Sequence, residues 1–390
     1  MSQIHRQKRN FVEARQFLQK AASLATAEMA EIPYNESLLY EAEGKIDQAV
    51  ATLQKALDTT AKPRPSDYSA RERSNRSFFW EKIGMLERGR ENFAAAEKAF
   101  RAMTESDPES APRAGVQIVE TARAAREHRR ALAEVESLAK KFPEDRSIAV
   151  VRASLLADVG EARQGAAILR GLLKNNAEDR EILLALAQVL EKGKLWTEAR
   201  EAVDKALGYS QTREQKRGVH FTYGSLLERQ KLYDDAEKHF RIVLEIDPDD
   251  ASAMNYLGYM LADRNVKLEE AHQLIQKALD QDPDNGAYLD SLGWVYYRQN
   301  KLDQAEEYLK RSLVKAPRDA TVHDHLGDVY VRQGKIRLAQ EQWQRSLREW
   351  DASPKSEANP DEIARIRKKL DAVKVRLAQE QGQPPKPGKN

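Results

Sequence analysis

The 390 residues include 64 basic and 62 acidic side chains, which interleave along the chain and leave no concentrated basic patch for nucleic acid. No stretch approaches the roughly 20 uninterrupted apolar residues of a membrane-spanning helix. The chain has no cysteine, which excludes disulfides, thiol nucleophiles and thiolate metal sites, and which fits either a reducing cytosol or a periplasm.

The chain starts with a short polar segment and then an amphipathic one, Phe11 to Leu24. We predict that this second segment is the second helix of a pair whose first helix is missing or reduced to about eight residues. Residues 1–29 are therefore interpreted as a leading half repeat. Two explanations stay open, namely an atypical capping end and the lack of an upstream segment; exposure of Phe11, Leu18 and Leu24 would favour the second. The start lacks the apolar core of a secretory signal.

Residues 30–216 are predicted to form the first part of a repeated array. Small residues recur at steps of 34 to 37, with one step of 47, at Ser37, Gly84, Val119, Ala153, Ala187, Gly224, Gly258, Gly293 and Gly327. The long step marks an insert loop near 58–77, which contains Pro63 and Pro65; a loop that leads into a longer first helix is the open alternative. The copies at 112–145 and 146–179 depart most from the pattern, and we expect them to pack less tightly.

Residues 217–353 hold the most regular copies. Here Leu289, Leu292, Gly293 and Tyr296 are followed by Ala305, and one repeat later by Leu326, Gly327, Tyr330 and Ala339. Small residues on both helices of a pair allow the two backbones to approach closely, and prolines such as Pro283 and Pro317 end the second helices. One pair cannot bury its apolar face alone, so neighbouring pairs must stack.

The last amphipathic segment is predicted as a capping helix over residues 354–380. Ile363, Ile366, Leu370, Val373 and Leu377 fall on one helical face, and charged residues fill the rest. The alternative is a free helix that binds a partner. Residues 381–390 contain no core-forming side chain and are predicted to be a disordered tail.

This pattern, over roughly residues 10 to 350, resembles the tetratricopeptide repeat (TPR) family. The resemblance implies an all-α fold, an α-solenoid in which antiparallel helix pairs form a right-handed superhelix, with about nine and a half units and a C-terminal capping helix. Residues 250–346 are similar to the ends of bacterial TPR proteins, many of which are envelope proteins. The compartment stays open between bacterial cytoplasm and periplasm, with an outer-membrane association if an upstream signal and lipid anchor exist.

No motif for chemistry stands out. His323 and His325 lie two positions apart on a predicted helix, so they point in different directions and are not expected to share a metal. No phosphate-binding loop or nucleophile elbow occurs. We therefore expect no enzyme activity, no catalytic residue, no metal and no cofactor.

The resemblance further implies that the first helices line a concave groove. Aromatic side chains there would supply contact area, and the acids would favour a partner with basic residues; the alternative for Trp294 and Tyr297 is that they fill the seam between helices. The predicted groove residues are Asn255, Tyr259, Asp290, Trp294, Tyr297, Arg298, Asp324, Asp328 and Arg332.

Two functions are compatible with the sequence. The first is a non-enzymatic protein-interaction scaffold that binds a peptide or helix of a partner protein in its groove. The alternative is an assembly module of a bacterial envelope complex, of the pilus or polysaccharide export type, that works through its outer or end surfaces. The sequence does not identify the partner or the oligomeric state.

Overall fold

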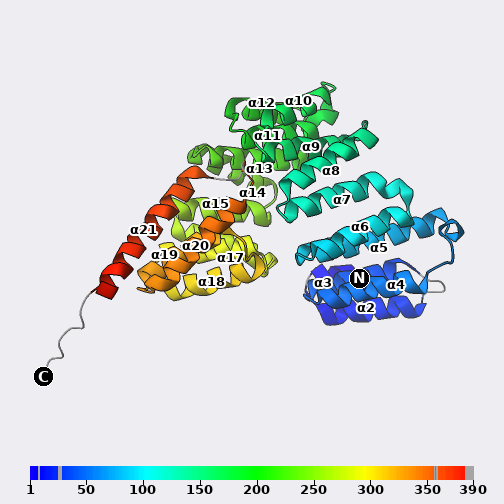
Figure 1. Ribbon diagram of the computed structural model, residues 1–390, viewed down its shortest axis with the longest axis horizontal. Coiled ribbons are helices and arrows are strands. Elements are labelled where there is room, and N and C mark those ends of the chain that lie inside the picture. Colours follow the sequence, from blue (N-terminus) through cyan, green and yellow to red (C-terminus); the bar gives the residue numbers. More distant parts are fainter. Residues whose placement is uncertain (8, 25–28, 355, 357–358, 383–390) are drawn as a thin grey trace. The chain divides into compact units, whose positions relative to one another are not determined.

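The computed structural model describes residues 1–7, 9–24, 29–354, 356 and 359–382, and within these ranges the regular structure is helical, without strands (Figure 1). Two compact units divide the chain, Met1–Leu155 and Leu156–Asn390, and each is described by itself. The division falls within α9 (Arg146–Asp158), in one of the copies that depart most from the repeat pattern.

Unit 1 stacks successive helix pairs. The predicted insert loop is shorter than expected, because α5 begins at Ala70, where Ser69 and Glu72 cap the helix reciprocally. Leu18 is buried in the first pair, whereas Leu24 is 71% exposed. The helices are α1 (Ser2–Gln7), α2 (Phe11–Leu24), α3 (Glu31–Ala42), α4 (Ile46–Thr59), α5 (Ala70–Gly89), α6 (Phe93–Ser106), α7 (Ala111–Ala124), α8 (His128–Lys141) and the first part of α9.

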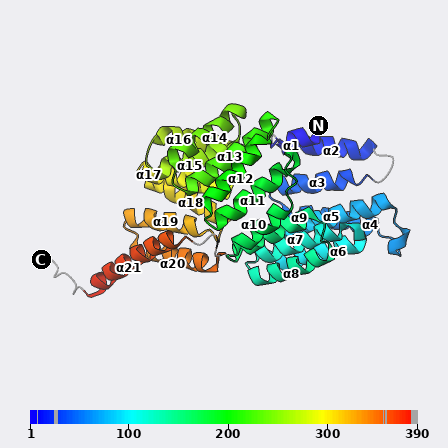
Figure 2. The same cartoon turned by 90° about the horizontal axis from the view of Figure 1, so that it is seen from above.

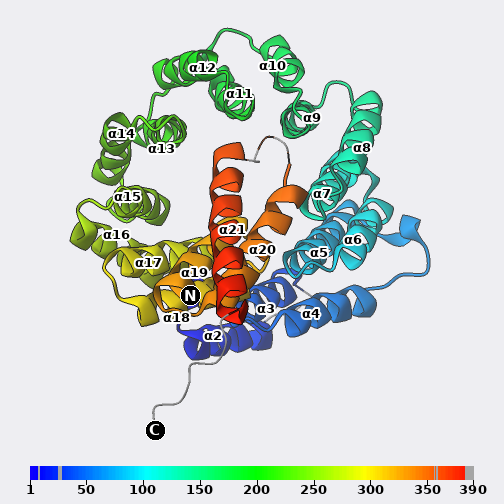
Figure 3. The ribbon, with the colours of Figure 1, turned by 60° about the vertical axis from the view of Figure 1, so that its left-hand side comes forward.

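Unit 2 continues the same architecture, which confirms the predicted all-α solenoid of helix pairs. Its helices are α10 (Ala162–Gly171), α11 (Arg180–Lys192), α12 (Trp196–Gly208), α13 (Arg213–Arg229), α14 (Tyr233–Ile246), α15 (Ala251–Asp263), α16 (Leu268–Gln281), α17 (Gly286–Arg298), α18 (Leu302–Lys315), α19 (Ala320–Arg332), α20 (Ile336–Ala352) and α21 (Pro360–Gly382). In Figures 2 and 3 these pairs follow one another along a curve. The first helices α11, α13 and α15 lie on its inner side, and α12, α14 and α16 lie on its outer side (Figure 3).

The last helix, α21, begins six residues later than the predicted start at 354 and runs to Gly382. It lies on the inner side of the curve of unit 2 (Figure 3). Residues 383–390 of the predicted tail lie outside the described part of the chain.

Close packing within a pair depends on the glycines of the first helices. A methyl group added at Gly224 would lie 2.8 Å from Cε1 of Phe240, and one added at Gly327 would lie 2.5 Å from Nε1 of Trp343. The aromatic rings therefore occupy the space that a larger residue would need. This is the role that the sequence predicted for the recurring small residues.

The turn between the two helices of a pair also repeats. One residue takes a left-handed conformation, and the next backbone N–H bonds back across the turn, as from Leu232 to the carbonyl of Leu227 (2.9 Å). This hydrogen-bond pattern satisfies carbonyl groups at the end of the first helix. In the described chain the left-handed residues at this position of the turns are Arg9, Gly44, Glu91, Arg126, Gly160, Lys194, Lys231, Asn265, Asn300 and Gly334, and the turn between α15 and α16 has a second one, Lys267.

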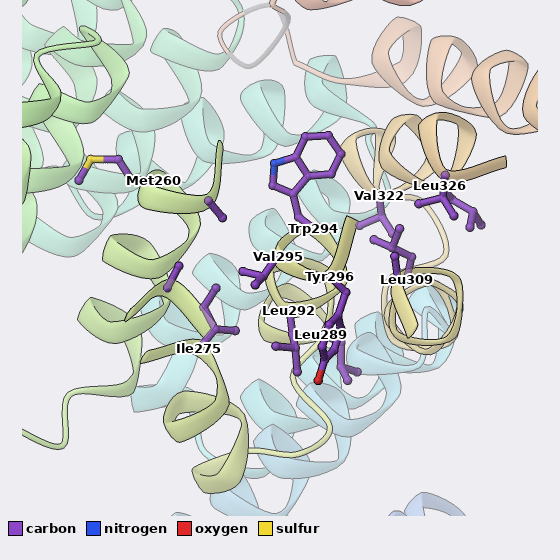
Figure 4. Packing of buried hydrophobic residues seen from close by; sticks show 14 of the residues in the cluster. Met260, Ile275, Leu289, Leu292, Trp294, Val295, Tyr296, Leu309, Val322 and Leu326 are labelled. Atoms are coloured by element: carbon purple, nitrogen blue, oxygen red, sulfur yellow. The ribbon is translucent and has the colours of Figure 1, made fainter. Parts of the chain in front are cut away.

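A continuous apolar core runs through unit 2 from Leu227 in α13 to Val373 in α21. Leu289, Leu292 and Tyr296 of α17 face Leu309 of α18, as Figure 4 shows. Trp294 leaves α17 on the other side of the helix from Tyr296 (Figure 4). The two aromatic residues of one helix therefore serve different surfaces.

Candidate functional site

The predicted groove residues gather on one surface of unit 2, which we call the inner face and define as the face that α15, α17 and α19 present with these side chains. Most of them are less accessible than expected. Asn255, Asp290, Trp294 and Asp324 are buried; Tyr259, Tyr297, Arg298 and Asp328 are partly buried; Arg332 is exposed.

Aromatic stacking organises the centre of the inner face. The indole of Trp294 stacks on the Tyr297 ring (centroids 4.7 Å apart) and on the His325 ring (4.0 Å). Tyr259 lies next to the same imidazole, at 6.2 Å between centroids. Trp294 itself is only 6% exposed, as expected of a side chain that fills a seam between helices.

Arg298 of α17 and Arg332 of α19 each form hydrogen bonds to the preceding repeat. Arg298 bonds to the carbonyl and the carboxylate of Asp263, which also accepts a hydrogen bond from Trp294 Nε1 (3.3 Å). Arg332 donates to the carbonyl of Tyr297 (3.0 Å) and to Asn300 Oδ1 (2.5 Å). These two predicted groove residues therefore hold the surface in shape.

One of the stacked rings, His325, also forms a buried ion pair with Asp290. His325 Nδ1 lies 2.9 Å from Asp290 Oδ1, and both side chains are buried. Burial alone lowers the pKa of His325, but the charge and hydrogen bond of Asp290, with Asp324 and Asp328 nearby, raise it above its ordinary value. The imidazole is therefore favoured in its charged form, with Nδ1–H donating to Asp290.

The acids of α19 face α21 rather than open solvent, which corrects their prediction as an open groove. Arg365 pairs with Asp324 (2.9 Å), and Lys369 pairs with both Asp324 (2.9 Å) and Asp328 (2.7 Å). Asp324 is only 2% exposed. The match between the basic residues of α21 and these acids was not predicted from the sequence, which indicated only a cap.

Three groups of the site were missed as functional residues: His325, considered only as a metal ligand, and the two cations Arg365 and Lys369. A signal for the cations was present in the sequence. They lie four residues apart, and each precedes a residue of the apolar stripe, Ile366 or Leu370. On a helix this spacing places both cations along one edge of that stripe.

Two further polar residues, Asn255 and His323, lie in different environments. The side-chain oxygen of Asn255 is buried and has no hydrogen-bond partner in the described residues. His323 points away from the inner face, with Nδ1 2.7 Å from Gln342 Oε1. No group of three or more potential ligands that could hold a metal occurs among the residues that the structure describes.

Unit 1 contains a hollow of about 860 Å³ beside the insert loop, lined by residues that include Thr60, Tyr68, Arg76 and Phe79. Arg76 donates there to the carbonyl of Leu57 (2.7 Å) and to Thr60 Oγ1 (3.1 Å). Its guanidinium thus links α5 to the C-terminal end of α4. The inner face of unit 2 remains the better candidate site.

The stacked pairs and their shared inner face define a helical-repeat protein. Family models described as tetratricopeptide repeat match residues 30–62, 150–214, 224–286 and 266–327. The chain therefore belongs to the tetratricopeptide repeat family. In the described residues, no helix is both long and apolar enough to cross a membrane.

The chain is similar to the TPR repeat-containing protein PA4667 of Pseudomonas aeruginosa, with 46% identity over 81 residues; these are 21% of this chain and only 14% of that protein. Two solved structures share the fold. One is the APC/C hetero-tetramer Cut9–Hcn1, at TM-score 0.51 and 13% identity, covering 89% of this chain and 70% of that chain. The other is a monomeric mutant of IFIT1 with Gppp-AAAA, at 0.53 and 15%, covering 91% and 84%.

Proposed function

We propose that the chain is a non-enzymatic protein-interaction scaffold whose inner face binds a helix or an extended peptide of a partner protein. One observation carries the proposal: Asp324 and Asp328 of this face already bind a helix, α21, through ion pairs, while the apolar side chains of α21 join the core and the helix packs against the neighbouring α20. A surface that accommodates one amphipathic helix has the shape and the chemistry for another.

The composition of the inner face supports the same conclusion. Trp294 and Tyr297 offer stacked aromatic area of the kind that dominates binding energy at interfaces. Asp324 and Asp328 favour a partner with Lys or Arg at matching positions. His325 is engaged by Asp290 and Trp294, which supports a role in shaping the surface rather than in proton transfer.

The proposal is tested by selecting displayed helical peptides on the full-length chain and measuring their affinity for variants. Tyr297→Ala with Asp328→Asn changes two partly buried residues of the inner face. We expect selected peptides to bind this variant about ten-fold or more weakly. The matched control replaces two exposed apolar residues of second helices, Val314→Ser with Leu338→Ser. Peptides that bind both variants as tightly as the wild type would refute the assignment of the inner face.

An assembly module that works through an end surface is the second candidate, because α2 exposes Val12 (68%) and Leu24 (71%). Exposed apolar side chains grouped on one helix are typical of an interaction surface. If this surface mediates self-association, Val12→Asp with Leu24→Asp should convert an oligomer to a monomer in sedimentation. A wild-type chain that is monomeric at high concentration would argue against it.

A further inference from the structure

The helix α21 is held differently from the first helices of the inner face: it packs against α20 and forms ion pairs with α19. The buried residues of α15, α17 and α19 number eight, eight and nine. In the described part of α21 the buried side chains are Ile366, Leu370 and Val373. Since burial of apolar area is the main source of packing energy, α21 is the more weakly attached helix.

The surface of α19 that α21 contacts, which we call its seat, carries acidic side chains, whereas a helix that only caps a repeat array would contact apolar side chains. Asp324 is buried beneath Arg365 and Lys369, and Asp328 lies beside it. Burial and the neighbouring charge of Asp324 raise the pKa of Asp328, while Lys369 acts in the opposite direction. Desolvated ion pairs add little net stability but strongly select a partner of matching charge.

The first turn of α21 belongs to the same network of charges. Glu362 pairs with Arg365, which also pairs with Asp324. Burial, with the charges of Asp263, Asp290, Glu228 and Glu362, raises the pKa of Tyr259 well above its ordinary value.

The connection to α20 is short. Residues 353–359 separate α20 from α21, and Ser356 donates a hydrogen bond to Asp158. A short covalent connection holds a helix near its seat at a high effective concentration. The wild-type chain therefore carries its own competitor for the inner face.

We propose that α21 occupies, from within the chain, the binding site for an amphipathic helix of a partner protein that repeats the chemistry of α21. That helix carries a basic residue followed by an apolar one, the same pair four residues later, and a further apolar residue three positions on, as do Arg365, Ile366, Lys369, Leu370 and Val373. This inference rests on the proposed function and identifies the class of partner.

The test uses a labelled synthetic peptide of residues 360–382 and the full-length chain. The variant Arg365→Glu with Lys369→Glu removes the three ion pairs and should release α21. We expect the peptide to bind this variant at least about ten-fold more tightly than the wild type, because the tethered competitor is gone. The matched control, Arg367→Glu with Lys368→Glu, makes the same charge change at exposed positions of α21 and should bind like the wild type.

Peptide variants test the recognition itself. A peptide with Arg365→Glu and Lys369→Glu should not bind the released chain, whereas a peptide with Arg367→Glu and Lys368→Glu should bind it like the natural peptide. Equal binding of the natural peptide to the wild type and the released variant, or no binding to the released variant, would overturn the inference.

A second measurement needs no variant of the chain. Excess natural peptide added to the wild-type chain should accelerate amide hydrogen exchange in residues 360–382 of the chain, and unchanged exchange would count against displacement. The peptide is also competed against the peptides selected on the inner face. If those peptides bind but are not displaced, the proposed function stands and this inference fails; if neither kind binds, both fail.

Discussion

The burial of Trp294 depends on contacts between repeats. The sequence placed it on a first helix, at a position that either fills a seam or faces a groove. Its ring is buried because Tyr297, His325 and Asp263 surround it, and His325 comes from the next first helix, one repeat further along. The helix position could be predicted from the 34-residue period. The burial could not, because it depends on contacts between repeats.

The glycines of α13 offer a matched pair for measuring close packing. Gly224→Ala should lower the free energy of unfolding by roughly 1–3 kcal/mol, because the new methyl group would overlap the Phe240 ring. Gly218→Ala in the same helix meets no atom within 4 Å and should raise it by up to about 1 kcal/mol. Urea unfolding followed by circular dichroism measures both; a shift in the same direction for both variants would contradict the packing role.

His325 should make stability depend on pH. Its pKa is raised in the folded chain, so its stabilising contribution is fully present below its ordinary pKa of about 6.5 and is lost as pH rises through the folded value. The wild type should therefore exceed His325→Gln in stability by more at pH 6 than at pH 9. The measurement is the urea midpoint of both proteins across this range.

Other histidines do not obscure this comparison. Burial lowers the pKa of His220 and His239, so their own effect is a loss of stability as pH falls below about 6.5. That effect is common to the wild type and His325→Gln and cancels in the difference. A difference that stays constant from pH 6 to pH 9 would show that His325 does not carry the charge assigned to it.

At the scale of the element, the left-handed conformation recurs in the turns between paired helices, although the residue type at this position varies. Three of the left-handed positions hold glycine, at 44, 160 and 334, whereas others hold Lys, Arg, Glu or Asn. The small residues of the helices could be predicted from the sequence, because packing fixes their spacing. The left-handed residues of the turns could not be predicted, because a long polar side chain at the surface tolerates this conformation at a modest cost.

Lys231 is a suitable place to measure that cost. It is exposed with a φ of 61°, so Lys231→Gly should raise the free energy of unfolding by about 0.5–1 kcal/mol. The reverse change, Gly334→Ala at a φ of 75°, meets no atom within 4 Å and should lower it by about 1 kcal/mol. Thermal unfolding of each variant beside the wild type measures both changes in stability. Stabilisation by both substitutions would exclude strain at these turns.

The boundaries of elements were predicted less well than their existence. The insert loop was placed near 58–77, but α5 starts at Ala70 because Ser69 and Glu72 form a capping box there. The capping helix was placed from 354, but α21 starts at Pro360. The apolar period that identifies a helix fades at its ends, where capping side chains decide the boundary.

At the scale of the molecule, the seating of α21 should depend on salt. Raising NaCl from about 0.1 M to about 1 M shortens the screening length from about 10 Å to about 3 Å and weakens attraction between the basic helix and the acids of α19. We expect amide exchange in residues 360–382 to accelerate about three-fold, in keeping with the modest energy of partly exposed ion pairs. Residues 286–315, held mainly by apolar packing, serve as the internal control and should be unaffected. Equal acceleration in both segments would indicate general loosening instead.

One hydrogen bond in the segment that leads into α21 also changes how unit 2 is expected to fold. In a repeat array most contacts join neighbours, so contact order is low and helix pairs can form one after another. The hydroxyl of Ser356, however, donates to Asp158 of α9 at 3.2 Å, across 198 residues of chain. During synthesis α9 to α20 can assemble as they emerge, while this long-range closure must wait for the end of the chain. The stretch after α20 therefore docks last, onto an array that is already complete.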